Sequence, residues 1–470
     1  MVNPRLYKLG ITAAMTLLIT GCVGTAALKK QSINNQAVYA GGGYQSAALS
    51  LETDLGLRDK KTGDLKQVKG KRANVLMHLD AGEAWRLSGE YSRSNEHYDA
   101  VEVLFSKEDN SSIGEDLAEG VGSILLNDSA ASYVPTPPER VLVNYYKALS
   151  FWSLGDKASS RIEFNRANER ARLAAESYEK DIQKAIKEAK KKRQKPATEN
   201  EELQSAVYEK YPNIQDWEVY DSFVNPAVAY TNALFLMGGD SSDRANANTL
   251  LKRVLAMTPG NSVVTSDIEF LESNPEKIEK NTWIIYEAGQ GPSLKENRFD
   301  IPFVIPDGKQ GTRVILLSYA LPEFVAGGQK FVGNNMLIDR EPIDFSVLAD
   351  MNKVAKTEFK KRWPGVLTRA TMSAITKALI QNEAGKQSGI ANLIATVYTA
   401  ASTKADVRGW EKTPAKWYLA KLNPKKGKSI LNIPYAASSV RVELDSEASE
   451  LIYVKQPSAS AKPLVAKVRL

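Results

Sequence analysis

The sequence GEAWRLSGEYSRSNEHYDAV, residues 82–101, contains the pattern on which the fold prediction depends. Two small residues, Gly82 and Ser94, are followed by the bulky Tyr98 at helical spacing. Small residues let two helical backbones approach closely, and the bulky side chain fills the groove beside the crossing. Gly89, between the two halves, suits the turn that would join them. The stretch therefore predicts two antiparallel helices packed against each other.

The same order of small, small and bulky residues recurs further along the chain. The second set is Ala148, Ser160 and Phe164, and the third is Ala233, Ala247 and Leu251. These sets resemble the tetratricopeptide repeat (TPR), with long insertions between the units. A generic antiparallel helical bundle is the alternative, since helical hairpins share a core in both cases. One long helix is expected over residues 157–195, which contain neither Pro nor Gly and are followed by Pro196.

The first 22 residues have the features of an export signal. Basic residues precede an apolar run over residues 9–20, which is too short to span a bilayer as a helix. The run leads into Leu-Ile-Thr-Gly-Cys at residues 18–22, and Cys22 is the only cysteine of the chain. This ending resembles the bacterial lipobox, which implies removal of residues 1–21 and lipid attachment at Cys22. An ordinary signal peptide with a chance cysteine is the alternative.

The lipobox resemblance places the mature protein in the bacterial cell envelope. Several acyl chains at Cys22 would hold it on a membrane far more firmly than one reversible chain. Val23 stands where Asp would favour inner-membrane retention, so the resemblance implies the outer membrane, facing the periplasm. Residues 22–37 are polar and small and are expected to form a tether. This compartment excludes nucleic acid as a partner.

Composition limits the chemistry that the chain could perform. One cysteine excludes an intrachain disulfide and Cys-based metal sites. Two histidines, His78 and His97, leave little material for a His-rich metal site, and we expect them on opposite helices of the first hairpin without forming a relay. The sequence has no nucleophile elbow, phosphate-binding loop or His-Glu-x-x-His motif. We therefore expect no enzymatic activity, no cofactor and no bound metal.

The formal net charge is +7, and the densest basic run occupies residues 184–195. Helix-forming residues interrupt this run, so we expect the solvated end of the long helix, where Lys and Arg lie favourably near the helix C-terminus. A contact with anionic lipid headgroups or glycans is the alternative.

The composition changes near residue 275. Beyond it, the β-branched and aromatic content predicts strands at residues 283–287, 300–305, 312–320, 417–422, 429–433, 440–444, 451–454 and 464–470. A helical block is expected at residues 343–403, with a break at residues 361–365 and a buried core helix at residues 390–401. The predicted fold is α+β and multidomain. A TPR-like helical solenoid at residues 38–275 precedes an antiparallel, β-rich, sandwich-like domain at residues 276–470 that carries the helical insertion.

One segment of the β-rich region carries a further resemblance. Residues 405–415, ADVRGWEKTPA, are followed by a strand and by Pro-Lys-Lys-Gly at residues 424–427. This signature, with turns at residues 286–289 and 321–322, resembles a family of uncharacterised Gram-negative outer-membrane lipoproteins. That family combines a lipobox, degenerate TPR-like helices and a β-rich domain, and residues 412–413 depart from its more apolar pattern. The resemblance implies fold and location, and no catalytic activity.

Within this segment Asp406, Arg408 and Trp410 alternate as they would along a strand. We expect Asp406 to pair with Arg408 while Trp410 covers both. Such a cluster typically serves as a structural joint. A site for a carboxylate or a sugar is the alternative.

These observations predict a lipid-anchored periplasmic scaffold or adaptor of the outer membrane. Helical solenoids bind peptides and protein partners on a concave surface. By repeat register that surface would present the partner-contacting residues Glu83, Arg86, Tyr145, Trp152 and Tyr230, together with Leu79, Leu149 and Leu234. The alternative is that these side chains fill the helical core.

Two other functions remain open at this point. One is regulation of peptidoglycan synthesis, by analogy with lipoprotein activators that carry TPR-like helices. The other is a carbohydrate-active enzyme, because a catalytic carboxylate pair can be recognised only in space. An envelope protein is the expected partner, and peptidoglycan or another glycan is a further candidate.

Overall fold

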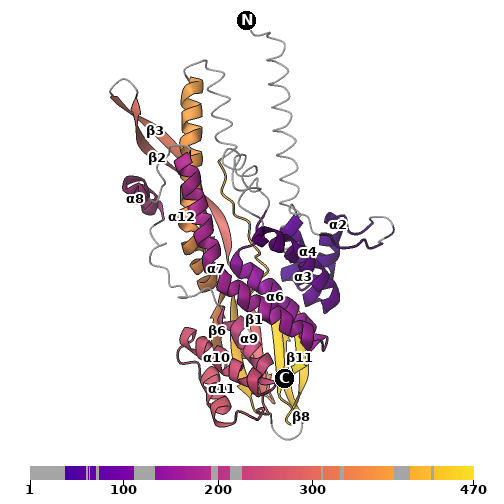
Figure 1. Cartoon of the computed structure of the whole chain (residues 1–470). Helices are drawn as coiled ribbons and strands as arrows, with labels where there is room; N and C mark the ends of the chain where they lie inside the picture. Colours follow the sequence, from indigo (N-terminus) through magenta and orange to yellow (C-terminus); the bar gives the residue numbers. More distant parts are fainter. Residues whose placement is uncertain are drawn as a thin grey trace.

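The structure of the chain is a computed structural model (Figure 1). It describes residues 37–59, 62, 64–69, 74–110, 133–191, 199–211, 225–307, 311–328, 333–385, 403–424 and 428–470. The described part is a mixed α/β protein in which helices dominate the first half and strands the second. Cys22, the leader and the core helix predicted at residues 390–401 lie outside the described residues.

Helices occupy the described chain up to residue 273. They are α2 (Tyr44–Asp54), α3 (Val75–Leu87), α4 (Tyr91–Asn110), α6 (Pro137–Ser153), α7 (Lys157–Lys191), α8 (Glu201–Lys210), α9 (Pro226–Met237), α10 (Ser241–Met257) and α11 (Ser262–Ser273). The pairs α3–α4, α6–α7 and α9–α10 pack as hairpins at the predicted positions. The long helix is observed as α7, which runs for 35 residues.

The predicted small residues lie buried inside these hairpins. A Cβ atom on Gly82 would lie 2.8 Å from the ring of Tyr98, so a larger residue would collide. Ser160 donates a hydrogen bond from its Oγ to the carbonyl oxygen of Ala148 at 2.9 Å. Gly89 precedes α4 with a φ of +86°, a conformation that favours glycine. The helical hairpins predicted from the spacing are therefore confirmed.

Strands and one long helix follow. The strands are β1 (Thr282–Ala288), β2 (Ser293–Asp307), β3 (Gly311–Val325), β4 (Leu337–Ile338), β5 (Glu341–Pro342), β6 (Ser346–Asp350), β7 (Lys416–Leu422), β8 (Lys428–Tyr435), β9 (Ser438–Asp445), β10 (Glu450–Gln456) and β11 (Leu464–Arg469), and the helix is α12 (Met351–Gly385). All the predicted strand stretches overlap observed strands. Strand β6 lies where the helical block was expected to begin, so that block starts at Met351 instead.

The strands form three sheets. A five-stranded sheet has the order β11-β10-β1-β7-β6, a four-stranded sheet has the order β5-β4-β8-β9, and β2 pairs only with β3 among the described strands. Strand β1 runs parallel to β10, which corrects the expectation of a purely antiparallel region. The long chain segment between these two strands allows the crossover that a parallel pair needs.

The five-stranded sheet lies between two layers. On one face, Trp283 and Ile285 of β1 enter a core shared with the helices. On the other face, Ile284 and Tyr286 enter a core shared with the four-stranded sheet. Every residue of β1 is buried for this reason. The five-stranded sheet therefore joins the helices to the four-stranded sheet. We use the name body for these two sheets together with α2, α3, α4, α6, the N-terminal half of α7, α9, α10 and α11.

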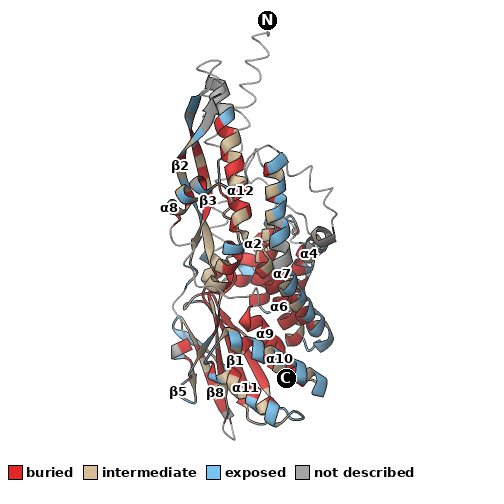
Figure 2. Cartoon of the chain, turned by 60° about the vertical axis from the view of Figure 1, so that its left-hand side comes forward, coloured by how far each residue is buried: buried red, intermediate tan, exposed pale blue. Residues whose placement is uncertain are grey.

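A second assembly projects from the body, and we call it the arm (Figure 1). It consists of β2, β3, α8, α12 and the C-terminal half of α7. Its own core contains Leu203, Val207, Tyr211, Ile301, Ile315, Leu317, Tyr319, Leu321, Phe359, Trp363, Val366, Leu367, Ala374 and Ala378. Figure 2 shows buried residues along α12 and along the hairpin beside it.

The break predicted at residues 361–365 does not occur, because α12 continues through Pro364. Proline removes one backbone hydrogen bond from a helix. Here the neighbouring Trp363, Val366 and Leu367 are buried in the core of the arm. This packing supports the helix through the proline, which the local sequence could not indicate.

Candidate functional site

Two of the predicted partner-contacting residues, Glu83 and Arg86, lie in an ionic network between α3 and the five-stranded sheet. Arg86 donates two hydrogen bonds to Glu83, at 2.7 and 2.8 Å. Lys455 Nζ on β10 lies 2.6 Å from a carboxylate oxygen of Glu83 and 3.3 Å from one of Glu287 on β1. The hydroxyl of Tyr146 on α6 donates to Glu287 at 3.1 Å. We call these five residues the buried joint.

The charges of the buried joint compensate one another. Two carboxylates face two cations, and each of the five residues is at most 1% exposed. Burial alone would raise the pKa of Glu83, but Arg86 and Lys455 outweigh it and lower that pKa below its usual value. The Arg86 guanidinium also lies 4.1 Å from the centre of the Tyr146 ring. The joint therefore fixes the helices to the sheet through paired charges.

The other predicted contact residues are buried as well. Tyr145 is fully buried, Tyr230 donates from its hydroxyl to Asp267 at 2.6 Å, and the indole N–H of Trp152 donates to the backbone carbonyl of Arg469 at 3.2 Å. Their companions are buried too: Leu79, Leu149 and Leu234. The expectation that these side chains line an exposed surface is therefore corrected. Strands β1, β10 and β11 share the helical core and cover the face that an open solenoid would leave to a partner.

The two histidines lie on α3 and α4 as predicted, but they contact each other, contrary to the prediction that they form no relay. His78 Nδ1 and His97 Nδ1 are 3.1 Å apart, and His97 Nε2 lies 3.3 Å from Glu52 Oε1. Burial, with a contribution from His97, lowers the pKa of His78 to about 4. Burial also lowers the pKa of His97, although Glu52 opposes it. Both histidines are at most 1% exposed. Their contacts with each other and with Glu52 therefore hold α2, α3 and α4 together, at a position that a substrate cannot reach.

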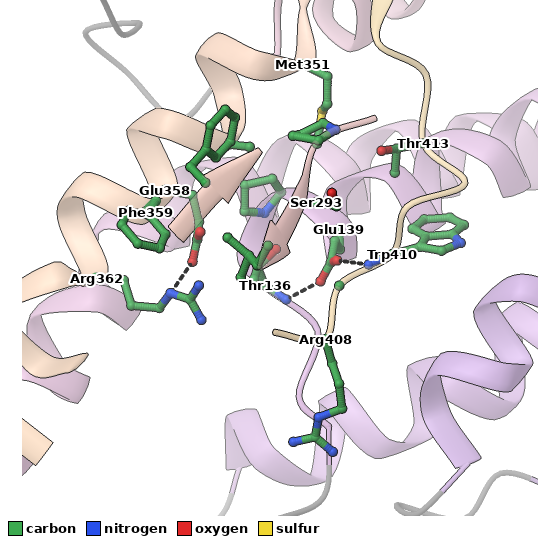
Figure 3. A pocket seen from close by; sticks show the side chains of 16 residues that line it. Thr136, Glu139, Ser293, Met351, Glu358, Phe359, Arg362, Arg408, Trp410 and Thr413 are labelled. Atoms are coloured by element: carbon green, nitrogen blue, oxygen red, sulfur yellow. Dashed lines mark hydrogen bonds and ion pairs between the residues drawn. The ribbon is translucent and has the colours of Figure 1, made fainter. Parts of the chain in front are cut away.

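A small cavity, the junction pocket, lies where the arm meets the body (Figure 3). Its walls come from the start of α6, the bases of β2 and β3, the first turns of α12 and the segment at residues 408–413. Glu358 and Arg362 form an ion pair of 3.0 Å on the α12 side. The cavity volume is about 70 Å³, whereas small-molecule sites usually enclose about 300 Å³ or more. The pocket can hold water but not a sugar or a cofactor.

Glu139 connects the two sides of this pocket. It accepts hydrogen bonds from the backbone N–H groups of Thr136 at 2.6 Å and Trp410 at 2.7 Å. A third hydrogen bond comes from the hydroxyl of Tyr133 at 2.6 Å. The first of these completes the capping box at the start of α6. Glu139 therefore fixes a helix end to the segment that leads into β7.

The predicted pair of Asp406 and Arg408 is confirmed, since Arg408 donates two hydrogen bonds to Asp406 at 2.8 and 2.7 Å. The surrounding residues do not form a strand, because the backbone N–H groups of Ala405 and Trp410 donate to glutamate side chains instead. Trp410 does not cover the pair. Its ring is buried in the body and packs edge to face against the ring of Tyr146, with centroids 5.7 Å apart.

A larger and more open cavity, the edge groove, lies beside β6 and has a volume of about 430 Å³. It is lined by Met257, Thr258, Pro259, Gly260, Asn261, Ser346, Val347, Leu348, Asp350, Lys353 and Lys416. Strand β6 ends the order of the five-stranded sheet, and its Val347 is 48% exposed. This site was not predicted, because residue 347 was expected in a helical block rather than in an edge strand.

Among the residues that the structure describes, no group of three or more His, Cys, Asp and Glu side chains is arranged to hold a metal ion. Across the same ranges, each helix is too short or too polar to cross a membrane. In comparisons with known proteins, the chain matches no protein-family model, no curated protein and no solved structure.

Proposed function

We propose that this chain is a lipid-anchored periplasmic scaffold or adaptor of the outer membrane, in the lipoprotein family that residues 405–415 resemble. The lipobox at residues 18–22 supports the location, because it ends in the single cysteine of the chain. The TPR-like order of small and bulky residues supports a scaffold, since helical repeats of this kind serve to bind partners.

The observation that carries this proposal is that the buried charges are paired with one another. Glu83, Glu287, Arg86 and Lys455 compensate one another between the helices and the sheet. A reactive site needs a perturbed group that a substrate can reach, whereas these groups stabilise a body of fixed shape. Such a body is suited to holding a partner in place.

The edge groove is the proposed contact with the partner. Strand β6 pairs only with β7 among the described strands. The Asn261 side chain donates to the carbonyl oxygen of Val347 at 3.5 Å, and an extended segment of another envelope protein that adds to β6 would replace this contact. Val347 is exposed there and supplies an apolar contact. Lys416 and Asp350, 3.4 Å apart on the groove wall, supply charges that recognise polar side chains of the segment.

Lipid attachment is tested by growing cells with an alkyne-labelled fatty acid. The parent chain is expected to take up the label and to fractionate with the outer membrane. The Cys22→Ser variant is expected to lose the label. A parent chain without label, or a label that persists in Cys22→Ser, contradicts the proposed anchor.

The partner is tested by purification from crosslinked envelopes. We expect one envelope protein in stoichiometric amount with the parent chain and its loss with Val347→Arg. Leu154→Arg is the matched control, because Leu154 is 52% exposed and lies after α6, outside the residues that line the groove. Equal recovery of the envelope protein with Val347→Arg and with Leu154→Arg would place the contact outside the edge groove. A cell-wall synthase as the recovered protein would make the chain a regulator of peptidoglycan synthesis.

A further inference from the structure

The outward face of the β2–β3 hairpin carries an exposed apolar patch near its tip. Val304 lies opposite Val314 and Pro302 lies opposite Leu316 in the register of the two strands. Val304, Val314 and Leu316 are 50%, 65% and 57% exposed. Phe303 and Ile315, which alternate with them, face the other way and pack in the core of the arm. We call Pro302, Val304, Val314 and Leu316 the tip patch.

Among the described residues, the large exposed apolar side chains of this face lie at its far end. Closer to the body, the same alternation places Asp300, Arg298 and Ser318 on that face. Figures 1 and 2 show that the tip of the hairpin points away from the body. The arm therefore carries its exposed apolar side chains where it reaches furthest from the rest of the molecule.

The arm also carries a cluster of exposed cations. The last turns of α7 lie against α12, where Ala189 packs on Met372. Lys187, Lys190 and Lys191 in these turns are exposed, and Lys190 lies 3.5 Å from Glu199. Figure 1 shows that this helix end points toward the same end of the molecule as the hairpin tip.

A lipid surface is the occupant that fits both features. Apolar side chains at a tip can enter the boundary between headgroups and acyl chains, and nearby lysines are attracted to anionic headgroups. A second copy docked tip to tip would instead bring two lysine clusters into one region, where their like charges repel. We propose that the arm touches an anionic membrane through the tip patch and the lysines of α7. The arm thereby sets the orientation of the body above the bilayer.

This inference rests on the proposed function in one respect only, namely that the proposed location places the protein beside a membrane. Contact with vesicles can be measured on the full chain carrying Cys22→Ser, which has no lipid attached. A failure of vesicle binding leaves the anchor at Cys22 and the partner at the edge groove untouched. The two proposals therefore fail separately.

Co-sedimentation with vesicles tests the contact. We expect binding of the Cys22→Ser chain to vesicles containing phosphatidylglycerol, and at least about tenfold weaker binding to pure phosphatidylcholine. Val314→Asp with Leu316→Asp is expected to weaken binding at least about tenfold, because two charges would enter the apolar boundary. Leu154→Asp with Ile162→Asp is the matched control, since it places the same two charges at exposed apolar residues of the body. Lys187→Glu with Lys191→Glu should reduce binding to the anionic vesicles alone.

A fluorescent label gives a second readout that does not depend on charged substitutions. Cys22 is the only cysteine, so Val304→Cys in the Cys22→Ser chain carries one thiol for an environment-sensitive dye. Anionic vesicles should shift its emission to shorter wavelength, whereas a dye at Leu154→Cys should not respond. No shift at position 304, or equal binding of the tip variant and its control, overturns the proposal. Light scattering that shows a dimer dissociated by Val314→Asp would identify a second copy as the occupant instead.

Discussion

The body and the arm differ in where their charged residues find partners. In the body, charged side chains such as Glu83 and Lys455 are fully buried and paired between helices and sheet. In the arm, the core cluster is apolar and aromatic, the buried Glu358 pairs with Arg362 of the same helix, and Val304, Val314 and Leu316 of the hairpin are exposed. A two-stranded hairpin alone is marginally stable, so β2 and β3 depend on α12. The difference indicates that the body fixes geometry while the arm makes contact.

The largest effect is expected from a substitution that breaks the buried joint. Lys455→Met removes the cation between Glu83 and Glu287, and leaving a buried charge without its partner costs about 3–5 kcal/mol. We expect this loss in the free energy of unfolding from urea titration. The control is Lys252→Met, because Lys252 also forms an ion pair but is 57% exposed in its side chain. Its effect should stay within about 0.5 kcal/mol. Equal losses would contradict the role of the joint.

A large but local effect is expected in the arm. Trp363 is 3% exposed and packs against Tyr211, with ring centroids 5.1 Å apart. Trp363→Ala should therefore destabilise the arm by about 3–5 kcal/mol. Hydrogen exchange should show faster exchange in β2, β3 and α12, with β1 and β10 unchanged. Leu379→Ala, at an exposed position of the same helix, is the control. Faster exchange throughout the body would mean that the arm and the body unfold as one unit.

Adding one methyl group compares a tightly packed helix crossing in the body with an open position in the arm. Gly82→Ala would place a Cβ atom 2.8 Å from the Tyr98 ring, and such overpacking costs about 1–3 kcal/mol. Gly311→Ala would meet no atom within 4 Å, so its effect should be near zero. Thermal melting of both variants measures the difference. A tolerated Gly82→Ala would show that the α3–α4 crossing is looser than described.

The last predicted effect is a pH dependence in the body, which is absent at neutral pH. His78 has a folded pKa of about 4, below the usual value for histidine, so the unfolded chain binds its proton first as the pH falls. Stability should therefore decrease between about pH 6.5 and pH 4, with a slope of up to about 1.4 kcal/mol per pH unit. His78→Gln should reduce this slope, so the variant should lose less stability than the parent chain between pH 7 and pH 4. An unchanged slope would contradict a buried neutral histidine.

Local patterns explain which parts of the fold could be predicted. The order of small and bulky residues located the hairpins, since contacts between neighbouring helices follow helical spacing. The β-branched and aromatic composition of β1 and β10 located those strands. The continuation of α12 through Pro364 was missed, because it depends on packing against β3, which is remote in sequence.

The site was harder to predict than the fold. Glu83 and Arg86 were assigned to an open surface, because repeat register cannot show that a sheet covers those positions. One signal was available: Glu287 and Lys455 interrupt strands that are otherwise strongly apolar. A charge inside a buried strand indicates a buried partner of opposite sign. The edge groove depends on the position of β6 in the sheet, which no local pattern contains.

Photocrosslinking in living cells tests the central claim most directly. A benzophenone side chain would replace Val347 at the edge groove, Val314 at the tip patch, or Leu154 at a control position. We predict a protein adduct of one defined mass from position 347, a lipid adduct from position 314 and neither from position 154. Protein adducts of the same mass from all three positions, or none from position 347, would contradict the account of a body that holds a partner and an arm that touches a membrane.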